Sequence, residues 1–497
     1  MAKRISGGML YSAVQCPHRV FLDATQDDSL RDEPNAFVEM LWEHGLAHEA
    51  AMVDEMAASL EDLSQLAGDD KAAATLQAMD AGAELIYSGR IEVDDMVGEP
   101  DLLRKTAKGY VPGDIKSGRG LEGGDDDDEG KPKLHYAMQL AHYAHILERI
   151  GRGTGKREGF IIDRNGDDIA YDLDLPLWGR EKRTSWDRYT ELLAEIRGML
   201  SGAHVTRGAL ASVCGLCHWH TYCSDELGRL DDLTLIPELG RAKRDVMAAA
   251  IGSVKALATV NIATFVKGTK TDFKGIGPDS LAKFQERAKL LSTAGAPYLK
   301  QAHGLPDTPL EVFFDVETDP MRNLCYLHGY YIVDLEAGKT EYKSFFMRAN
   351  TPEEEAAAFA ESWALLKWAM TRGTVYVYSP YERTTMRALS RKYPEVAKEE
   401  EVSELFARPN MVDLYTDVVR KKTEWPVRNH SIKTLAKHLG FAWRDTHPSG
   451  AASIEWYHRW VETADAAIAQ RILQYNEDDC VATKVLLDGI RKLPVQA

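Results

Sequence analysis

The stretch Leu310-Glu-Val-Phe-Phe-Asp315-Val-Glu317-Thr-Asp is an apolar strand pattern that ends in acidic residues. Side chains alternate along a strand, so Asp315 and Glu317 share one face. Far downstream, Tyr475-Asn-Glu-Asp-Asp479 places a phenol and a carboxylate four residues apart, on one face of a helix. Gathered carboxylates are costly unless they bind cations, and two hard divalent ions can clamp both reacting oxygens of a phosphodiester. The pattern predicts a metal-dependent hydrolytic site.

The size and charge of the chain limit the classes of protein to consider. Its 497 residues exceed what one hydrophobic core supports. The net charge of −17 argues against coating nucleic acid by bulk electrostatics, but metal sites use acids, so it does not exclude a nuclease. We find no membrane-length apolar run and no signal-peptide pattern, and we expect a cytoplasmic protein without membrane association.

The patterns along the chain divide it into three parts, with boundaries at 1–230, 231–305 and 306–497. In the first part, a helix at 36–60 precedes strand signals at 84–116. The second part is helical. The third begins with strands at 312–316, 326–333 and 375–378 and ends in long helices. We expect an α/β multidomain protein.

The third part resembles the DEDD exonucleases, which have a ribonuclease H-like fold, and most closely their YprB-type branch. The likeness covers roughly residues 309–492 and rests on five residues: Asp315, Glu317, Glu382, Tyr475 and Asp479. The resemblance implies that the four acids hold two metal ions and that Tyr475 orients the attacking water. One departure is Glu382, because most of these enzymes have Asp there, and Asp413 is an additional candidate acid.

A second acid set in the first part resembles the PD-(D/E)xK nucleases of the RecB type. It consists of Gly98-Glu-Pro-Asp101 and Gly113-Asp114-Ile-Lys116. The resemblance implies that Asp101 and Asp114 bind Mg²⁺ or Mn²⁺ and that Lys116 orients water and stabilises negative charge at the scissile phosphate. The fold implied is a restriction-endonuclease-like core.

Two helical motifs extend this match. His48 in Gly45-Leu-Ala-His48 falls where the RecB-type branch places a metal-binding histidine, and an imidazole ligand favours Mn²⁺ over Mg²⁺. Gln139-Leu-Ala-His-Tyr143 matches the Q-x-x-x-Y helix of these nucleases, with both residues on one face. We expect the neighbouring His142 to lie on the helix surface.

Four of the six cysteines, Cys16, Cys214, Cys217 and Cys223, form a metal-binding pattern. They resemble the ligands of the iron–sulfur RecB-type nucleases, which implies a [4Fe–4S] cluster joining the two ends of the nuclease domain. The alternative is zinc, for which His218 or His220 could replace one thiolate. Cys325 and Cys480 are expected to be buried or incidental.

The second part contains Lys274-Gly275-Ile-Gly277-Pro, which resembles the turn of a helix-hairpin-helix motif. Such a turn presents backbone N–H groups to a phosphate, so Gly275 and Gly277 are candidate nucleic-acid contacts.

Taken whole, the chain resembles predicted RecB-type nucleases fused to a YprB-type ribonuclease H-like domain. This implies a metal-dependent nuclease with two sites, the C-terminal one a 3′–5′ exonuclease, acting on DNA in preference to RNA. The alternative is a nucleic-acid-binding adaptor with one or both sites inactive. DNA repair, phage defence and CRISPR-linked processing are all compatible with this reading, and helicase or CRISPR partners are not specified by the sequence.

Overall fold

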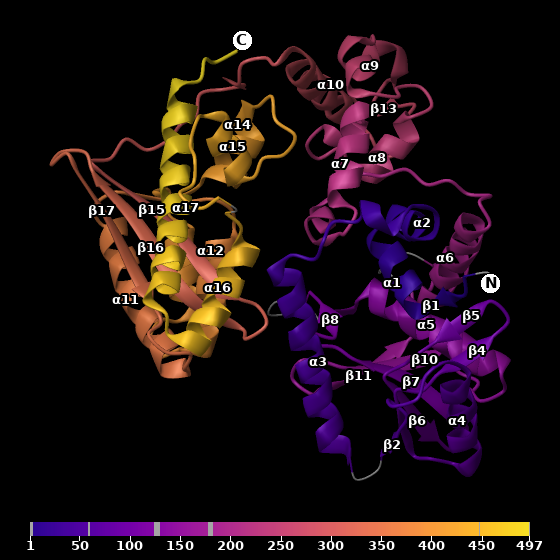
Figure 1. Ribbon diagram of the computed structural model, residues 1–497. Helices are drawn as coiled ribbons and strands as arrows, with labels where there is room; N and C mark the ends of the chain where they lie inside the picture. The colour runs from indigo at the N-terminus through magenta and orange to yellow at the C-terminus, as the bar shows by residue number, and fades with distance from the viewer. Residues whose placement is uncertain (1–2, 58–59, 124–129, 177–181, 447, 497) are drawn as a thin grey trace. The chain divides into compact units, whose positions relative to one another are not determined.

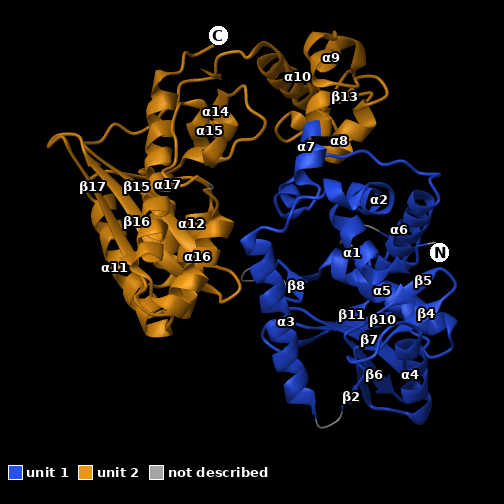
Figure 2. Cartoon of the chain, in the orientation of Figure 1, with its two compact units in different colours: residues 1–225 blue, residues 226–497 orange. Residues whose placement is uncertain are grey.

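The computed structural model describes residues 3–57, 60–123, 130–176, 182–446 and 448–496 (Figure 1). The chain forms two compact units, Met1–Asp225 and Glu226–Ala497 (Figure 2). Within the described ranges, no helix combines the length and apolar character needed to cross a bilayer.

The first unit is built on a six-stranded mixed sheet with the strand order β11-β10-β7-β6-β3-β2. At its centre, β6 and β7 form an antiparallel hairpin in which Leu102 lies opposite Gly113. β10 then runs parallel to β7. The strands are β2 (Leu60–Asp62), β3 (Leu85–Tyr87), β6 (Leu102–Thr106), β7 (Gly109–Ile115), β10 (Glu158–Ile162) and β11 (Asp168–Asp172).

Helix α5 is the central helix of this unit and lies against both of its sheets. It is mostly buried and packs on β7, β10 and the small sheet β1-β5-β4. The remaining elements are α1 (Gly7–Gln15), α2 (Pro17–Thr25), α3 (Ala36–Met56), α4 (Gly68–Ala81), α5 (Leu134–Arg149), α6 (Ser185–Leu200), α7 (His220–Arg229), β1 (Ile5–Ser6), β4 (Ile91–Val93), β5 (Met96–Gly98), β8 (Leu121–Glu122) and β9 (Lys131–Pro132).

The expectation that His142 lies on the surface of this helix is wrong. His142 is fully buried, and its Nε2 lies 3.0 Å from the carbonyl of Ile5 and 3.1 Å from that of Val97. Burial lowers its pKa to about 4, so the ring is neutral at pH 7. The histidine therefore ties α5 to the small sheet.

The second unit contains a five-stranded sheet with the order β17-β16-β15-β18-β19. β15 is central, antiparallel to β16 and parallel to β18. Its strands are β15 (Leu310–Asp319), β16 (Leu324–Asp334), β17 (Lys339–Phe346), β18 (Thr374–Val377) and β19 (Met411–Asp413), close to the ranges that the sequence predicts.

Alternation along β15 separates a core face from a functional face. Val312, Phe314 and Val316 point into the core beneath α11 and α12. Phe313 points the other way and packs with residues of α17, and Asp315 and Glu317 follow it on that face. The helices of this domain are α11 (Pro352–Met370), α12 (Tyr381–Lys392), α13 (Glu399–Phe406), α14 (Arg420–Lys422), α15 (Ile432–His438), α16 (Gly450–Thr463) and α17 (Ala466–Lys492).

The helical segment before β15 belongs to the second unit. It contains α8 (Gly240–Met247), α9 (Val254–Thr259), the hairpin β12 (Val266–Lys267) and β13 (Lys270–Thr271), and α10 (Pro278–Thr293). Arg287 of α10 is fully buried and binds Glu424 at 2.8 Å, and β14 (Tyr298–Leu299) pairs with β20 (Thr423–Glu424). The boundary near residue 305 stays a prediction.

Candidate active sites

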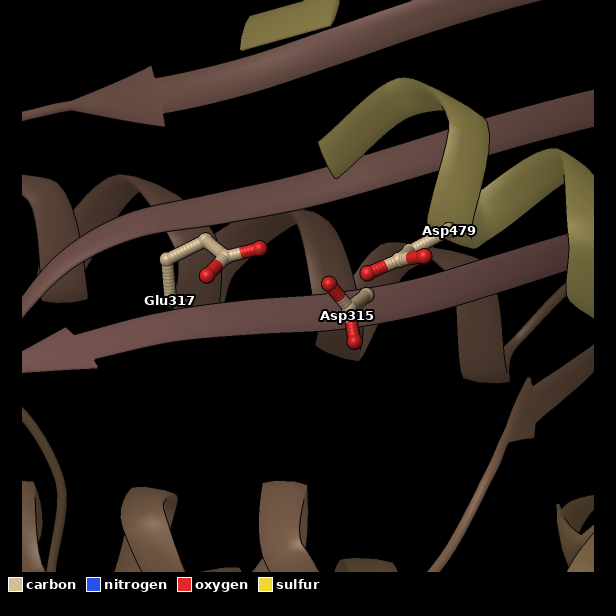
Figure 3. Close-up of side chains that lie close together, drawn as sticks. All are labelled: Asp315, Glu317 and Asp479. Carbon is tan, nitrogen blue, oxygen red and sulfur yellow. The ribbon is translucent and has the colours of Figure 1, made fainter. Parts of the chain in front are cut away.

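Three carboxylates meet at the functional face of β15 (Figure 3). Asp315 and Glu317 come from β15 and Asp479 comes from α17, and one oxygen of each lies within 4.8 Å of the others. Of the histidines, cysteines and acids that the structure describes, these are the only three that gather so closely. Side chains separated by about 160 positions in the sequence thus form one site, which we call the carboxylate trio.

The trio is an electrostatically unfavourable arrangement without cations. Glu317 and Asp479 are only 6% and 9% exposed. Burial and the charges of Glu317 and Asp479 raise the pKa of Asp315 well above its usual range, and burial with the charge of Asp479 raises the pKa of Glu317 to about 8. Hard divalent cations prefer carboxylate oxygens and would relieve this repulsion. The residues present therefore fit the divalent metals that the sequence predicts.

Polar side chains that the sequence reasoning missed hold the trio in place. Asn476 Nδ2 donates to Asp315 Oδ2 at 2.7 Å, and Trp443 Nε1 donates to Asp479 Oδ1 at 2.7 Å. Each of these hydrogen bonds uses one oxygen of the carboxylate and leaves the second oxygen to other groups of the site. Asn476 directly follows Tyr475 in the Tyr475–Asp479 motif, so its place in the sequence could have indicated that it lies at this site. Trp443 lies in a loop and gave none.

Tyr475 contacts Asp479 of the trio and the nearby Lys433. Its pKa is raised well above the usual value by burial and by the charge of Asp479, to which it also hydrogen-bonds. On its other side, Lys433 Nζ lies 2.8 Å from the Tyr475 hydroxyl oxygen and 3.5 Å from Asp479 Oδ2. Lys433 comes from α15, the helix that the sequence places between the second and third motifs. It is the cation of this site.

Glu382 lies near the trio without joining it. It occupies the first turn of α12, is 3% exposed, and its Oε2 meets no hydrogen-bond donor among the described residues. Burial raises its pKa to about 8, with a contribution from Asp413, and its charge in turn acts on Asp315. Asp413 is engaged as a helix cap, since its Oδ1 accepts the N–H groups of Ser379 and Thr416. An unsatisfied buried carboxylate oxygen beside the trio is compatible with a further metal ligand.

The acid pair of the first unit lies on the central hairpin. Asp101 directly precedes β6 and Asp114 lies in β7, where it is 1% exposed. Ile115 N–H donates to Asp101 Oδ2 at 2.8 Å, and Lys116 Nζ lies 3.1 Å from Asp114 Oδ2. Burial and the charge of Asp114 raise the pKa of Asp101 to about 8. The three residues predicted from the sequence are thus brought together.

Two consecutive residues of α3, His48 and Glu49, contact different partners. His48 Nε2 lies 3.2 Å from the carbonyl oxygen of Asp163. Its neighbour Glu49 accepts a hydrogen bond from the Tyr87 hydroxyl at 2.9 Å, and its charge adds to the raised pKa of Asp101. Glu49 is therefore an acid of this site that the sequence reasoning missed, although it directly follows the quoted motif.

Gln139 and Tyr143 of α5 form a hydrogen-bonded pair near the two acids. Gln139 Nε2 donates to the Tyr143 hydroxyl at 2.9 Å. The buried ring of Tyr143 is packed tightly on Gly7 and Gly98, where a Cβ atom would come within 2.7 and 2.6 Å of it. These two glycines therefore allow the tyrosine to reach the hairpin. Burial raises the pKa of Tyr143 well above its usual value, so the phenol stays neutral.

The four predicted cysteines line one cavity. Cys16 lies at the junction of α1 and α2, Cys214 and Cys217 lie in and after a 3₁₀ turn, and Cys223 lies in α7. Hydrogen bonds also join the two ends of the domain here, since Asp23 Oδ1 accepts from His218 at 2.8 Å and from Trp219 at 2.9 Å. Cys325 and Cys480 are buried, as expected.

The predicted helix-hairpin-helix turn precedes α10. Gly275 has a φ of +79°, which favours glycine, and Gly277 caps the helix with Pro278 at its first position. Apart from the glycine itself and its chain neighbours, no atom of the described residues lies within 4 Å of a Cβ placed at either glycine. The backbone here is open to a ligand.

Comparison with known families identifies both domains. Residues 14–224 match the PD-(D/E)XK nuclease superfamily, and residues 312–490 match the RNase_H superfamily model RNase_H_2. A search of curated proteins finds no match. The matched ranges contain the hairpin acids and the carboxylate trio, respectively. The chain therefore joins a PD-(D/E)XK nuclease superfamily domain to an RNase H superfamily domain, both within a mixed α/β multidomain protein.

Proposed function

We propose that this protein is a metal-dependent nuclease with two phosphodiester-hydrolysing sites and that DNA is its preferred substrate. The observation that carries the proposal is the carboxylate trio. Its three acids, of which Glu317 and Asp479 are buried, have oxygens within 4.8 Å of one another, and such a group is costly unless it binds a cation. Nuclease-superfamily membership of both domains supports a nucleic-acid substrate.

The C-terminal site is proposed to act as a 3′–5′ exonuclease. Asp315, Glu317 and Asp479 would hold divalent ions, with Glu382 as a further ligand. Such ions lower the pKa of bound water and neutralise charge on the leaving oxygen. The Tyr475 hydroxyl, which accepts a hydrogen bond from Lys433, is proposed to orient the attacking water. Lys433 also supplies positive charge where negative charge develops on the phosphate.

The N-terminal site is proposed to use Asp101 and Asp114 as ligands for Mg²⁺ or Mn²⁺. Lys116, 3.1 Å from Asp114, is proposed to orient water and to stabilise negative charge at the scissile phosphate. His48 stays the proposed imidazole ligand, and the position of Glu49 near Asp101 makes it an additional candidate. Gln139 and Tyr143 are proposed to position the hairpin.

The cysteine cavity is proposed to hold a [4Fe–4S] cluster. Zinc thiolates lie about 3.8 Å apart, given Zn–S bonds of about 2.3 Å in a tetrahedron. Among the described residues no three of these thiols come within 4.8 Å of one another, which favours the larger group. The cavity itself is small, about 20 Å³, and this keeps zinc as the alternative. Either group would join the two ends of the domain.

The turn at Gly275 and Gly277 is proposed to contact a nucleic-acid phosphate. Its glycines are exposed and unobstructed, and Lys270 and Lys274 are exposed nearby in the sequence. Backbone N–H groups and nearby lysines bind phosphate without reading sequence.

The test is cleavage of end-labelled single-stranded DNA, duplex DNA and RNA by anaerobically purified protein with Mg²⁺ or Mn²⁺. Asp114→Asn and Asp479→Asn should each remove a distinct set of products, and the double variant should be inactive. Asp168→Asn and Asp488→Asn, two acids exposed on β11 and α17, serve as controls. Binding without cleavage by the wild type would favour the adaptor alternative.

A further inference from the structure

A groove of about 840 Å³ in the first unit lies outside both acid sites. One wall is the N-terminal half of α3, with Val38, Leu41 and Trp42, and the other is formed by residues around Cys217. Tyr11 and Arg19 contribute from α1 and α2. All of these residues belong to Met1–Asp225.

The two halves of helix α3 differ in how they are packed. Its C-terminal half packs Met52, Val53 and Met56 on the apolar cluster beneath the central sheet. Its N-terminal half instead leaves Trp42, which lines the groove, 58% exposed. A large exposed aromatic side chain in a groove is typical of a binding surface.

The same helix connects the groove with the hairpin acids. Trp42 and Glu49 are seven residues apart, so they share one face at a spacing of about 10 Å. Between them, Gly45 carries no side chain, and a Cβ there would lie 4.0 Å from the hydroxyl of Ser117, the residue after Lys116. Helix α3 therefore runs from the groove to the residues beside the N-terminal acid pair.

Aromatic rings connect Tyr11, which lines the groove, with Lys116 beside the acid pair. Tyr11 lies 6.2 Å from Tyr136 between ring centroids, and Lys116 Nζ lies 6.0 Å from the Tyr136 ring. Arg19 Nε is buried and meets no hydrogen-bond acceptor among the described residues. Three acids line the groove. Asp28 is paired with Arg31, Asp32 accepts the Thr221 N–H, and Glu33 is the third.

We propose that this groove binds an unpaired nucleic-acid strand, with a base stacked on Trp42 and a phosphate at Arg19, and leads it to Asp101, Asp114 and Lys116. The inference rests on the proposed nuclease function and names its substrate class. Bases present their flat faces to aromatic side chains only when they are unpaired, whereas a duplex offers groove edges and phosphates. Stacking on aromatics between cations is the mode of binding for single strands of DNA and RNA.

The first experiment isolates the N-terminal site in an Asp479→Asn background and measures cleavage of single-stranded and duplex oligonucleotides, each as DNA and RNA. Trp42→Ala should raise KM for the single strand roughly tenfold with kcat nearly unchanged. Trp42→Phe should restore most of the affinity. Leu46→Ala removes a more exposed apolar side chain from the next turn, outside the groove, and should have no effect.

The second experiment does not depend on cleavage. The inactive Asp114→Asn/Asp479→Asn protein is photocrosslinked to single strands carrying 5-iodouracil, and the crosslinked peptide is mapped. Crosslinks to residues 36–56 or to Tyr11 would support the groove. An unchanged KM in Trp42→Ala, an equal loss on duplex, or crosslinks only elsewhere would overturn it. Absence of any cleavage by the wild type would instead contradict the proposed function.

Discussion

The ammonium group of Lys433 lies 2.8 Å from the hydroxyl oxygen of Tyr475, so the cation and the phenol of the C-terminal site form one unit. The same ammonium lies 5.0 Å from the centre of the Tyr475 ring and 3.5 Å from Asp479 Oδ2. Because the ammonium donates to the phenol oxygen, the O–H bond of Tyr475 is directed away from Lys433 and toward Asp479. Lys433 is thus a positioning residue for Tyr475.

Replacing Lys433 with Met should lower kcat of the exonuclease by roughly a hundredfold, with a small change in KM, because both the charge and the fixed phenol act on the transition state. Lys433→Arg should retain part of the activity. The measurement is steady-state cleavage in an Asp114→Asn background, and Lys437→Met, exposed on the same helix, is the control. Equal losses in the Lys433→Met, Tyr475→Phe and double variants would confirm the unit, while independent, multiplying losses would contradict it.

Metal binding should depend on pH because the acids of both sites are held partly protonated. The pKa of Glu317, of Asp101 and of Glu382 is raised to about 8, from ordinary values near 4. When folding raises the pKa of a carboxyl, the metal-free protein loses stability as the pH rises from the pKa of that group in the unfolded chain to its pKa in the folded chain. Metal ions compete with protons for these oxygens, so binding releases protons.

We therefore expect the increase in melting temperature caused by Mn²⁺ or Mg²⁺ to grow between about pH 5 and pH 8. Differential scanning calorimetry at fixed ionic strength measures it. The variant Asp315→Asn/Glu317→Gln should lose the pH dependence assigned to the second unit while keeping that of the first. A metal-induced shift that is the same at pH 5.5 and 8.5 would count against both carboxylate sites as metal sites.

The cysteine cavity yields a prediction with a spectroscopic readout. Protein purified without oxygen should absorb in the visible range and contain iron, and Cys214→Ser should lose both. Cys325→Ser changes a buried cysteine outside the cavity and should keep them. Because Asp23, His218 and Trp219 also join the two ends, Cys214→Ser should fold, with a lower melting temperature. Stoichiometric zinc in place of iron would establish the alternative.

The sequence predicted the elements that carry periodic signals. The strands around 312–316, 326–333 and 375–378, the acids at their ends and the Tyr475–Asp479 helix spacing all follow from local rules of side-chain direction. The superfamily of each domain was likewise predictable, since its motifs are short and ordered along the chain.

Other features depend on contacts between distant segments and left no local pattern. His142 has a polar side chain on a helix, yet it is buried because two backbone carbonyls of neighbouring strands accept its hydrogen bonds. Trp443 and Lys433 reach Asp479 from elements that only the fold brings near it. The charge of Glu49 acts on Asp101 because of how α3 packs, which periodicity alone does not determine.

A buried ion pair makes the attachment of the helical segment to the RNase H domain testable. Arg287 and Glu424 are 0% and 2% exposed and lie 2.8 Å apart. Arg287 also binds Glu238 at 3.0 Å; burial alone would raise the pKa of Glu238, but Lys283 and Arg287 lower it to about 2. Removing Arg287 leaves the buried Glu424 with only the partly exposed Lys300, 3.0 Å away, and breaking a buried pair in this way costs about 3–5 kcal/mol.

Arg287→Met should therefore destabilise the second unit by about that amount, and adding Glu424→Met should recover much of the loss, because the apolar pair needs no partner charge. Calorimetry of the full chain should show the change in the transition of the second unit alone. Since the pKa of Glu238 is lowered by folding, its contribution is present above about pH 4.5 and is lost as pH falls toward 2. An Arg287→Met chain with unaltered transitions would mean that the segment folds independently of the RNase H domain.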